Sequence, residues 1–82
     1  MPSTLTRRKP ALRWPQRPSV THHPALGKRQ RWWSQDRQYR IERFPEWAGV
    51  DPYIVLRDNE KIGTARGYVA AQKIAQRHYR SM

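Results

Sequence analysis

The sequence predicts a small α+β protein, in which a three-stranded antiparallel sheet packs against one C-terminal helix and an extended basic arm comes first. Residues 38–44 alternate between polar and apolar positions, residues 53–56 form an apolar run, and residues 65–80 are rich in helix formers with one apolar side. At 82 residues and 9.9 kDa, the chain has room for one small domain. We therefore expect an arm over residues 1–31 and a β-β-β-α module over residues 32–82.

The arm is predicted from the composition of residues 1–31. This segment holds eight of the 17 Lys and Arg residues, none of the six acids and five of the seven prolines. Proline lacks an amide donor and moves its predecessor away from helix. A high net charge with few aliphatic residues is typical of a segment that cannot offset its ordering entropy by burial, so we expect disorder unless a partner binds. A mitochondrial presequence is an alternative, although the prolines disfavour its amphipathic helix.

The first predicted strand, residues 38–44, has a buried and an exposed side. Tyr39 and Ile41 fall on one side, and the other side carries Arg40, Glu42 and Phe44. Pro45 ends this strand, because proline cannot donate to the ladder.

A β-hairpin is predicted to follow. The β-branched and aromatic residues 53–56 are expected in a strand covered on both faces. Asp58 and Asn59 tolerate positive φ, so a tight turn is expected there, leading into a short third strand at residues 61–62.

The helix is predicted from Ala65 to Arg80, with Thr64 as its N-cap. At about 100° per residue, its residues divide into two sides. The side expected against the sheet holds Tyr68, Ala71, Ile74, Ala75, His78 and Tyr79. The opposite side is a basic ridge of Arg66, Lys73, Arg77 and Arg80, with no acid three or four residues away from any of them. We expect this ridge to contact phosphates.

The sequence disfavours an enzyme. The chain has no cysteine, and its six carboxylates form no spaced pair with a histidine or with each other on one element. His22 and His23 are adjacent in a Pro-flanked segment, which favours a solvated pair over a metal site, and His78 is expected to be half-buried. Gly63 and Gly67 match no nucleotide-binding loop. We expect no cofactor, no metal and no small-molecule substrate.

Charge points instead to a polyanionic partner. The net charge is +11, and arginine outnumbers lysine by thirteen to four. Arginine offers a planar fork for phosphate or guanine and also stacks on bases. No apolar run approaches the roughly 20 residues that span a bilayer, and a signal peptide is not evident. The expected location is therefore cytoplasmic, with the nucleoid or the ribosome as possible associations.

Indoles beside this charge suggest base stacking. Trp32 and Trp33 follow the basic run of residues 28–31, and each is able to stack on an unpaired base. Packing against the core is an equally weighted alternative for at least one of the two. The residues predicted to bind DNA or RNA are Arg7, Arg8, Lys9, Arg13, Lys28, Arg29, Arg31, Trp32, Trp33, Arg40, Arg66, Lys73, Arg77 and Arg80.

The order of elements over residues 33–80 resembles the sheet-plus-helix DNA-binding module of integrase arm-binding and plant AP2-type domains. That resemblance is architectural and implies that Arg40, Glu42 and Phe44 enter the major groove. The last strand and helix are also similar to those of a double-stranded-RNA-binding domain, but Arg66-Gly67-Tyr68 stands in place of its lysine cluster.

Two functions follow from these observations. The favoured one is non-enzymatic nucleic-acid binding through the basic arm and the helix ridge. The alternative is a small phage-type or accessory protein that docks on an acidic protein through its sheet edge or through a surface of Trp32, Trp33 and Trp47.

Overall fold

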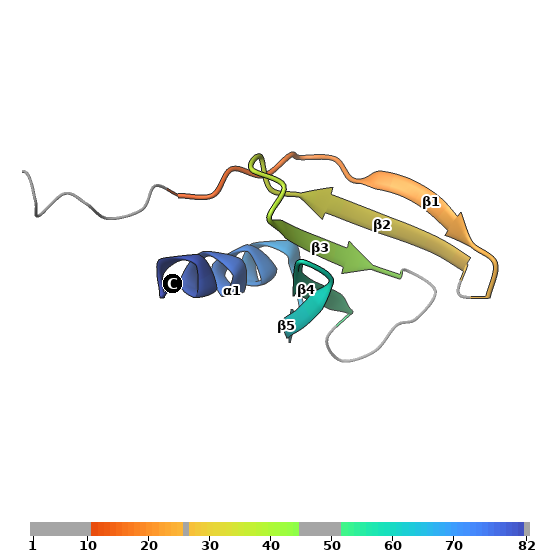
Figure 1. The fold of residues 1–82 in the computed structure, drawn as a ribbon. Coiled ribbons are helices and arrows are strands. Elements are labelled where there is room, and N and C mark those ends of the chain that lie inside the picture. The colour runs from red at the N-terminus through yellow and green to blue at the C-terminus, as the bar shows by residue number, and fades with distance from the viewer. Residues whose placement is uncertain (1–10, 26, 45–51, 82) are drawn as a thin grey trace, which may run out of the picture.

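The computed structural model describes residues 11–25, 27–44 and 52–81, which form one antiparallel sheet and one helix (Figure 1). Neighbouring strands in the sheet follow the order of the sequence. The α+β class and the helix packed on the sheet are confirmed, but the predicted number of three strands is wrong, because the sheet has five. The elements are β1 Ser19–His23, β2 Gly27–Trp33, β3 Tyr39–Arg43, β4 Tyr53–Arg57, β5 Glu60–Ala65 and α1 Tyr68–Arg80.

The two additional strands come from the segment that was expected to be an arm. β2 pairs with β3 in the register that sets Trp32 opposite Ile41, and β1 pairs back onto β2. Gly27, at φ 81°, begins β2 in a backbone conformation that favours glycine. The predicted boundary after Arg31 thus falls inside β2. The composition of residues 1–31 also predicts that they are dispensable for folding, which truncation of the chain tests.

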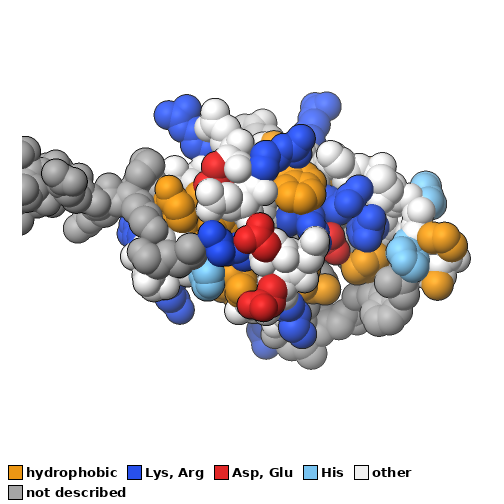
Figure 2. Space-filling model, in the orientation of Figure 1, with side chains coloured by type: hydrophobic (Ala, Val, Ile, Leu, Met, Phe, Trp, Pro, Cys, Tyr) orange, Lys and Arg blue, Asp and Glu red, His pale blue; other side chains and the backbone are white. Residues whose placement is uncertain are grey.

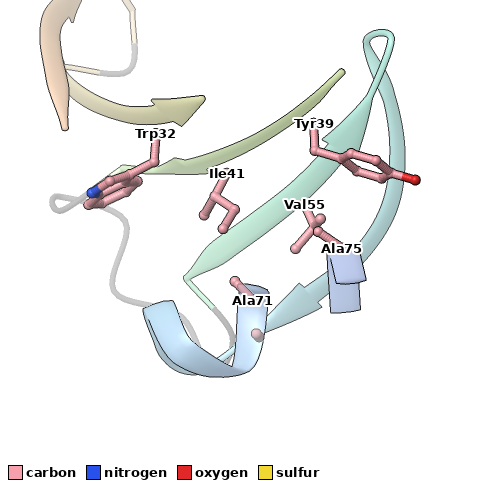
Figure 3. Packing of buried hydrophobic residues seen from close by; sticks show 7 residues of the cluster. Trp32, Tyr39, Ile41, Val55, Ala71 and Ala75 are labelled. Atoms are coloured by element: carbon pink, nitrogen blue, oxygen red, sulfur yellow. The ribbon is translucent and has the colours of Figure 1, made fainter. Parts of the chain in front are cut away.

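The core lies between the sheet and α1 (Figure 3). Tyr39 and Ile41 of β3 and Val55 of β4 are fully buried, which confirms the inward side predicted for the first strand. Ala71 and Ala75 of α1 have 0% exposure, so the predicted rotation of the helix is confirmed. Their small side chains allow the helix to lie close to the sheet, because close-packed interiors leave little empty space.

The helix begins three residues later than its pattern predicts. Thr64 and Ala65 belong to β5, where Ala65 pairs with Tyr53 of β4. The N-cap is Gly67, which has no side chain to cap the first turn. Strand pairing has therefore displaced the cap predicted at Thr64. In the described part of the chain, no helix has the length and apolar character needed to cross a membrane.

The β4–β5 hairpin confirms the predicted turn. Asp58 and Asn59 have φ of 51° and 69°, the positive values that these two residue types tolerate better than most. The Asn59 side chain also accepts a hydrogen bond from Arg40 Nη1 at 3.0 Å, which ties the turn to β3.

Residues 11–18 pack against the sheet and helix. Leu12 and Trp14 contact the core as half-buried side chains. Three hydrogen bonds fix the backbone of this segment: the Leu12 amide donates to Gln76 Oε1 at 2.6 Å, the Gln35 amide to the Arg13 carbonyl at 2.9 Å, and the Tyr68 hydroxyl to the Pro15 carbonyl at 2.6 Å. The segment therefore becomes one wall of the surface described next.

Candidate nucleic-acid interface

The two faces of the sheet have different surroundings. Side chains of paired residues in an antiparallel sheet point to the same face, and successive residues alternate between faces. The register places Trp32, Ile41 and Val55 on the face that packs against α1. Among the described residues, no helix covers the other face, called here the open face (Figure 1). Its positions on β2, β3 and β4 are Arg29, Arg31, Trp33, Arg40, Glu42, Ile54 and Leu56.

The two adjacent tryptophans of β2 point to opposite faces. Trp32 is 5% exposed, and its ring centroid lies 4.8 Å from that of Tyr68 in the core. Trp32 is therefore a core residue, the alternative weighed for one of these indoles, and its ring cannot stack on a base without leaving the core. Trp33 is half-buried on the open face. The predicted docking surface of Trp32, Trp33 and Trp47 does not form as one patch, and Trp47 lies outside the described residues.

Trp33 is flanked by two guanidinium groups. The Cζ atoms of Arg37 and Arg40 lie 5.4 and 5.0 Å from the centroid of its ring, within the range of cation–π attraction. Arg37 has φ 66°, an uncommon conformation for a residue with a side chain. Hydrogen bonds around the buried Ser34 hold this turn: the Arg37 amide donates to the Ser34 carbonyl at 2.9 Å, and the Tyr39 amide donates to Ser34 Oγ at 3.1 Å.

Arg40 is engaged in contacts within the protein. Its Nε lies 2.6 Å from Glu42 Oε2, and its side chain is 13% exposed. Glu42, which is 8% exposed, also lies opposite Arg31 on β2. The resemblance to sheet-based DNA readers implied that Arg40, Glu42 and Phe44 are exposed to bases. The structure contradicts this for Arg40 and Glu42, because the ion pair and burial hold both against the sheet.

A basic groove opens where residues 11–18 pass the end of β2. It is open to solvent and has a volume of about 470 Å³. Four arginines and two indoles contribute to its lining, and no carboxylate does. Its walls are formed by Arg13, Trp14, Pro15, Arg17, Ser19, Arg31, Trp33, Ser34, Gln35 and Arg37.

The groove combines predicted and unpredicted residues. Arg13, Arg31 and Trp33 were predicted from charge and aromatic content, and the structure brings them together. Arg17 and Arg37 were missed, although both line the groove and Arg37 also lies against the ring of Trp33. The packing of residues 11–18 against the turn at Gln35 brings Arg17 to the groove, and the turn after β2 brings Arg37 there. No pattern in the sequence signals either placement.

Tyr68 helps to fix the wall of the groove. Burial raises the pKa of its hydroxyl, while a hydrogen bond with Gln72 acts in the opposite direction. The hydroxyl therefore stays protonated at neutral pH and remains a donor to the Pro15 carbonyl. The neighbouring Trp14 is anchored by its contact with the core.

A second basic surface lies on the outer side of α1. Lys73, Arg77 and Arg80 are exposed there, and they line a shallow hollow without a carboxylate; we call these three residues the helix ridge. Within the described ranges, no ion pair involves any of the three. Arg66 is exposed but precedes the helix, so it is not part of the ridge. Lys and Arg side chains appear along both the upper and lower margins of Figure 2, with the acidic ones nearer the middle.

Of the other residues predicted to bind nucleic acid, Lys28 and Arg29 do not lie on one surface. Lys28 and Arg29 are neighbours on β2 and therefore point to opposite faces. Arg7, Arg8 and Lys9 lie outside the described residues.

The histidines are not gathered into a metal site. His78 is half-buried, as predicted, and its Nδ1 shares a 2.8 Å hydrogen bond with the Tyr39 hydroxyl. No group of three His, Asp or Glu side chains able to hold a metal is found within the described part of the chain.

Comparisons with protein-family models, curated proteins and solved structures found no match to this chain.

Proposed function

We propose that this protein is a non-enzymatic nucleic-acid-binding protein that contacts phosphates through the groove. The observation that carries the proposal is the lining of the groove, in which Arg13, Arg17, Arg31 and Arg37 converge with two indoles and no carboxylate. A guanidinium group binds phosphate oxygens through two parallel N–H donors, a geometry that a lysine ammonium does not provide.

Contacts within the protein also hold part of the groove lining in place without a ligand. Hydrogen bonds hold the wall at Arg13 and Pro15, and the ring of Trp33 attracts the guanidinium of Arg37. Fixing cationic side chains in advance reduces the ordering cost of association. The single carboxylate of the open face among the described strands, Glu42, is neutralised by Arg40 and repels an incoming phosphate little.

The basic N-terminal residues and the helix ridge belong to this proposal as further sources of attraction. Positive charge spread over a surface steers a polyanion toward a site even where no direct contact forms. The cytoplasmic location, with nucleoid or ribosome association, remains part of the same proposal.

Binding to unrelated DNA and RNA oligonucleotides at several salt concentrations tests the function. Each phosphate contact lowers the slope of log K against log salt by about 0.9 on duplex DNA and about 0.7 on single strands. We expect measurable binding to all sequences at low salt and a steep slope. Changing both Arg17 and Arg37 to Gln should weaken binding and reduce the slope by the equivalent of about two contacts.

Lys61→Gln is the matched control, because Lys61 is exposed on β5, at the opposite edge of the sheet from β1. It should leave the slope almost unchanged. Absence of binding to every nucleic acid at low salt, together with capture of an acidic protein, would favour the protein-binding alternative.

A further inference from the structure

We propose that the groove selects unpaired nucleotides, with one base stacked on the indole of Trp33 and the adjoining phosphates held by Arg17 and Arg37. This inference rests on the proposed function and specifies its ligand class as single-stranded nucleic acid. It depends on three features of the groove: its size, its aromatic lining and the fixed position of its walls.

The groove is large enough for one nucleotide. A volume of about 470 Å³ lies within the range of sites that accept one small organic ligand. A double helix keeps its bases paired and stacked, so it would meet the groove with its backbone and not with the face of a base. An unpaired nucleotide is able to turn its base into the groove and leave its phosphates at the arginines.

The aromatic lining requires an accessible base face. Stacking on an indole is open to any base, because each has a π-face, but in a duplex those faces are covered by the neighbouring pairs except at the ends. Trp33 lies on the open face of the sheet, and Trp14 lines the same groove from residues 11–18. Two indoles beside four arginines form the combination used to bind single strands, in which rings hold bases and cations follow the backbone.

The walls are fixed on both sides. Trp14 packs against the core and Trp33 ends β2, so neither ring depends on a ligand for its place. Arg37, whose φ is positive, holds its guanidinium over the Trp33 ring, 5.4 Å from the centroid, so a base that stacks on this side of the ring displaces that exposed side chain toward the adjoining phosphate. A backbone conformation of this kind costs free energy and persists only where surrounding contacts hold it, as those around Ser34 do here.

The direct test compares a 12-nucleotide oligo(dT) with a blunt 12-base-pair DNA duplex at the same salt concentration. The unaltered protein should bind the single strand at least tenfold more tightly and show quenching of tryptophan fluorescence on binding. Trp33→Leu keeps an apolar side chain but removes the stacking surface. We expect it to weaken single-strand binding by about 5- to 150-fold and to change duplex binding less than twofold.

Trp33→Phe is the matched variant, since it retains a ring and should restore most of the single-strand affinity. Circular dichroism and the unfolding midpoint check that each variant is folded. If Trp33→Leu does not fold, the affinity ratio and the fluorescence quenching of the unaltered protein still decide the question. Equal affinity for the two ligands, or equal weakening of both by a folded Trp33→Leu, overturns single-strand selection and leaves the proposed function standing. If the unaltered protein binds neither oligo(dT) nor the duplex, the proposed function is overturned as well.

Discussion

The groove and the helix ridge carry similar positive charge in different settings. In the groove, Arg37 lies against the indole of Trp33, and Arg31 lies opposite Glu42 in the sheet. On the helix ridge, Lys73 and Arg77 are exposed. Two of the groove arginines, Arg31 and Arg37, thus have a neighbouring side chain from the sheet beside them, whereas Arg13 and Arg17 are exposed like the ridge cations.

This difference teaches what each surface is able to recognise. Exposed cations on a helix attract any polyanion, and salt screens that attraction within about 10 Å at 0.1 M ionic strength. Cations fixed beside aromatic rings distinguish ligands by shape and by the availability of a flat base. Charge predicted the helix ridge but only two of the four groove arginines, Arg13 and Arg31, and the surroundings of the two surfaces separate them.

The largest expected effect comes from destroying both surfaces together. Ala75 is fully buried between α1 and the sheet, so Ala75→Arg places an unpaired charge in the core. The expected cost is about 4 kcal/mol or more, comparable with the whole stability of a small domain. Circular dichroism and thermal unfolding should show loss of the cooperative fold.

Ala70→Arg provides the control, because Ala70 is exposed on the same helix. This variant should fold and retain binding. A soluble, cooperatively folding Ala75→Arg protein would mean that α1 is rotated differently from the packing described here.

The next largest effect comes from a truncation that removes most of the groove lining together with β1. Composition alone predicts that residues 1–31 are dispensable for folding. The structure leads to the opposite expectation, since this deletion removes β1, most of β2 and the contacts of Leu12 and Trp14 with the core. We expect cooperative unfolding to be lost. A chain beginning at Ala11 keeps every contact described above and should unfold with nearly the same midpoint; a stable protein lacking residues 1–31 would restore the predicted boundary.

A smaller effect is expected from removing cations from either surface and measuring the salt dependence of binding. Changing Lys73 and Arg77 together to Gln removes two exposed cations and should leave the unfolding midpoint nearly unchanged, because these side chains bury little. Changing Arg17 and Arg37 together to Gln should reduce the slope of log K against log salt on oligo(dT) by about 1.4. If the groove holds the phosphates, the Lys73 and Arg77 variant should reduce that slope by less than half as much. Equal reductions would place phosphates on the ridge too, as its charge pattern predicts.

The smallest effect concerns the wall of the groove at alkaline pH. Burial raises the pKa of Tyr68 above its usual value of about 10, so the folded state favours the neutral hydroxyl. This contribution to stability is present below pH 10 and is lost as the pH rises through the folded-state pKa. Tyr68→Phe should cost about 1 kcal/mol at pH 8 through the lost hydrogen bond to Pro15 and should make urea unfolding less sensitive to pH above 10.

Tyr39 also has a pKa raised by burial, against the lowering influence of Arg57, so part of the alkaline sensitivity should remain in Tyr68→Phe. An unchanged pH dependence in that variant would show that the Tyr68 hydroxyl does not contribute to it.

Several local features could be predicted because each depends on neighbours in the sequence. The spacing of Ala71 and Ala75 identifies the buried side of α1, since helical residues four apart share a face. The alternation of Tyr39 and Ile41 identifies the inner side of β3 in the same way. Asp58 and Asn59 predict their turn through their tolerance of positive φ.

The first hairpin could not be predicted from the same kind of pattern. β2 reads Gly-Lys-Arg-Gln-Arg-Trp-Trp, in which both faces carry charge or aromatic rings and no apolar alternation marks a strand. Pairing with β3 supplies the backbone hydrogen bonds that make this segment a strand, and that pairing depends on residues distant in the sequence. The start of α1 differs from its prediction for a related reason, because β5 stays paired with β4 as far as Ala65.

The sequence by itself therefore determined the charge, the inward side of the helix and the β4–β5 turn, all of which follow from local periodicity and residue type. Only the tertiary structure decided that Trp32 belongs to the core while Trp33 faces outward, and that Arg17 and Arg37 line one groove. The physical reason is that strand register assigns each side chain to a face, and the contacts of Leu12 and Pro15 with the helix bring separate segments together.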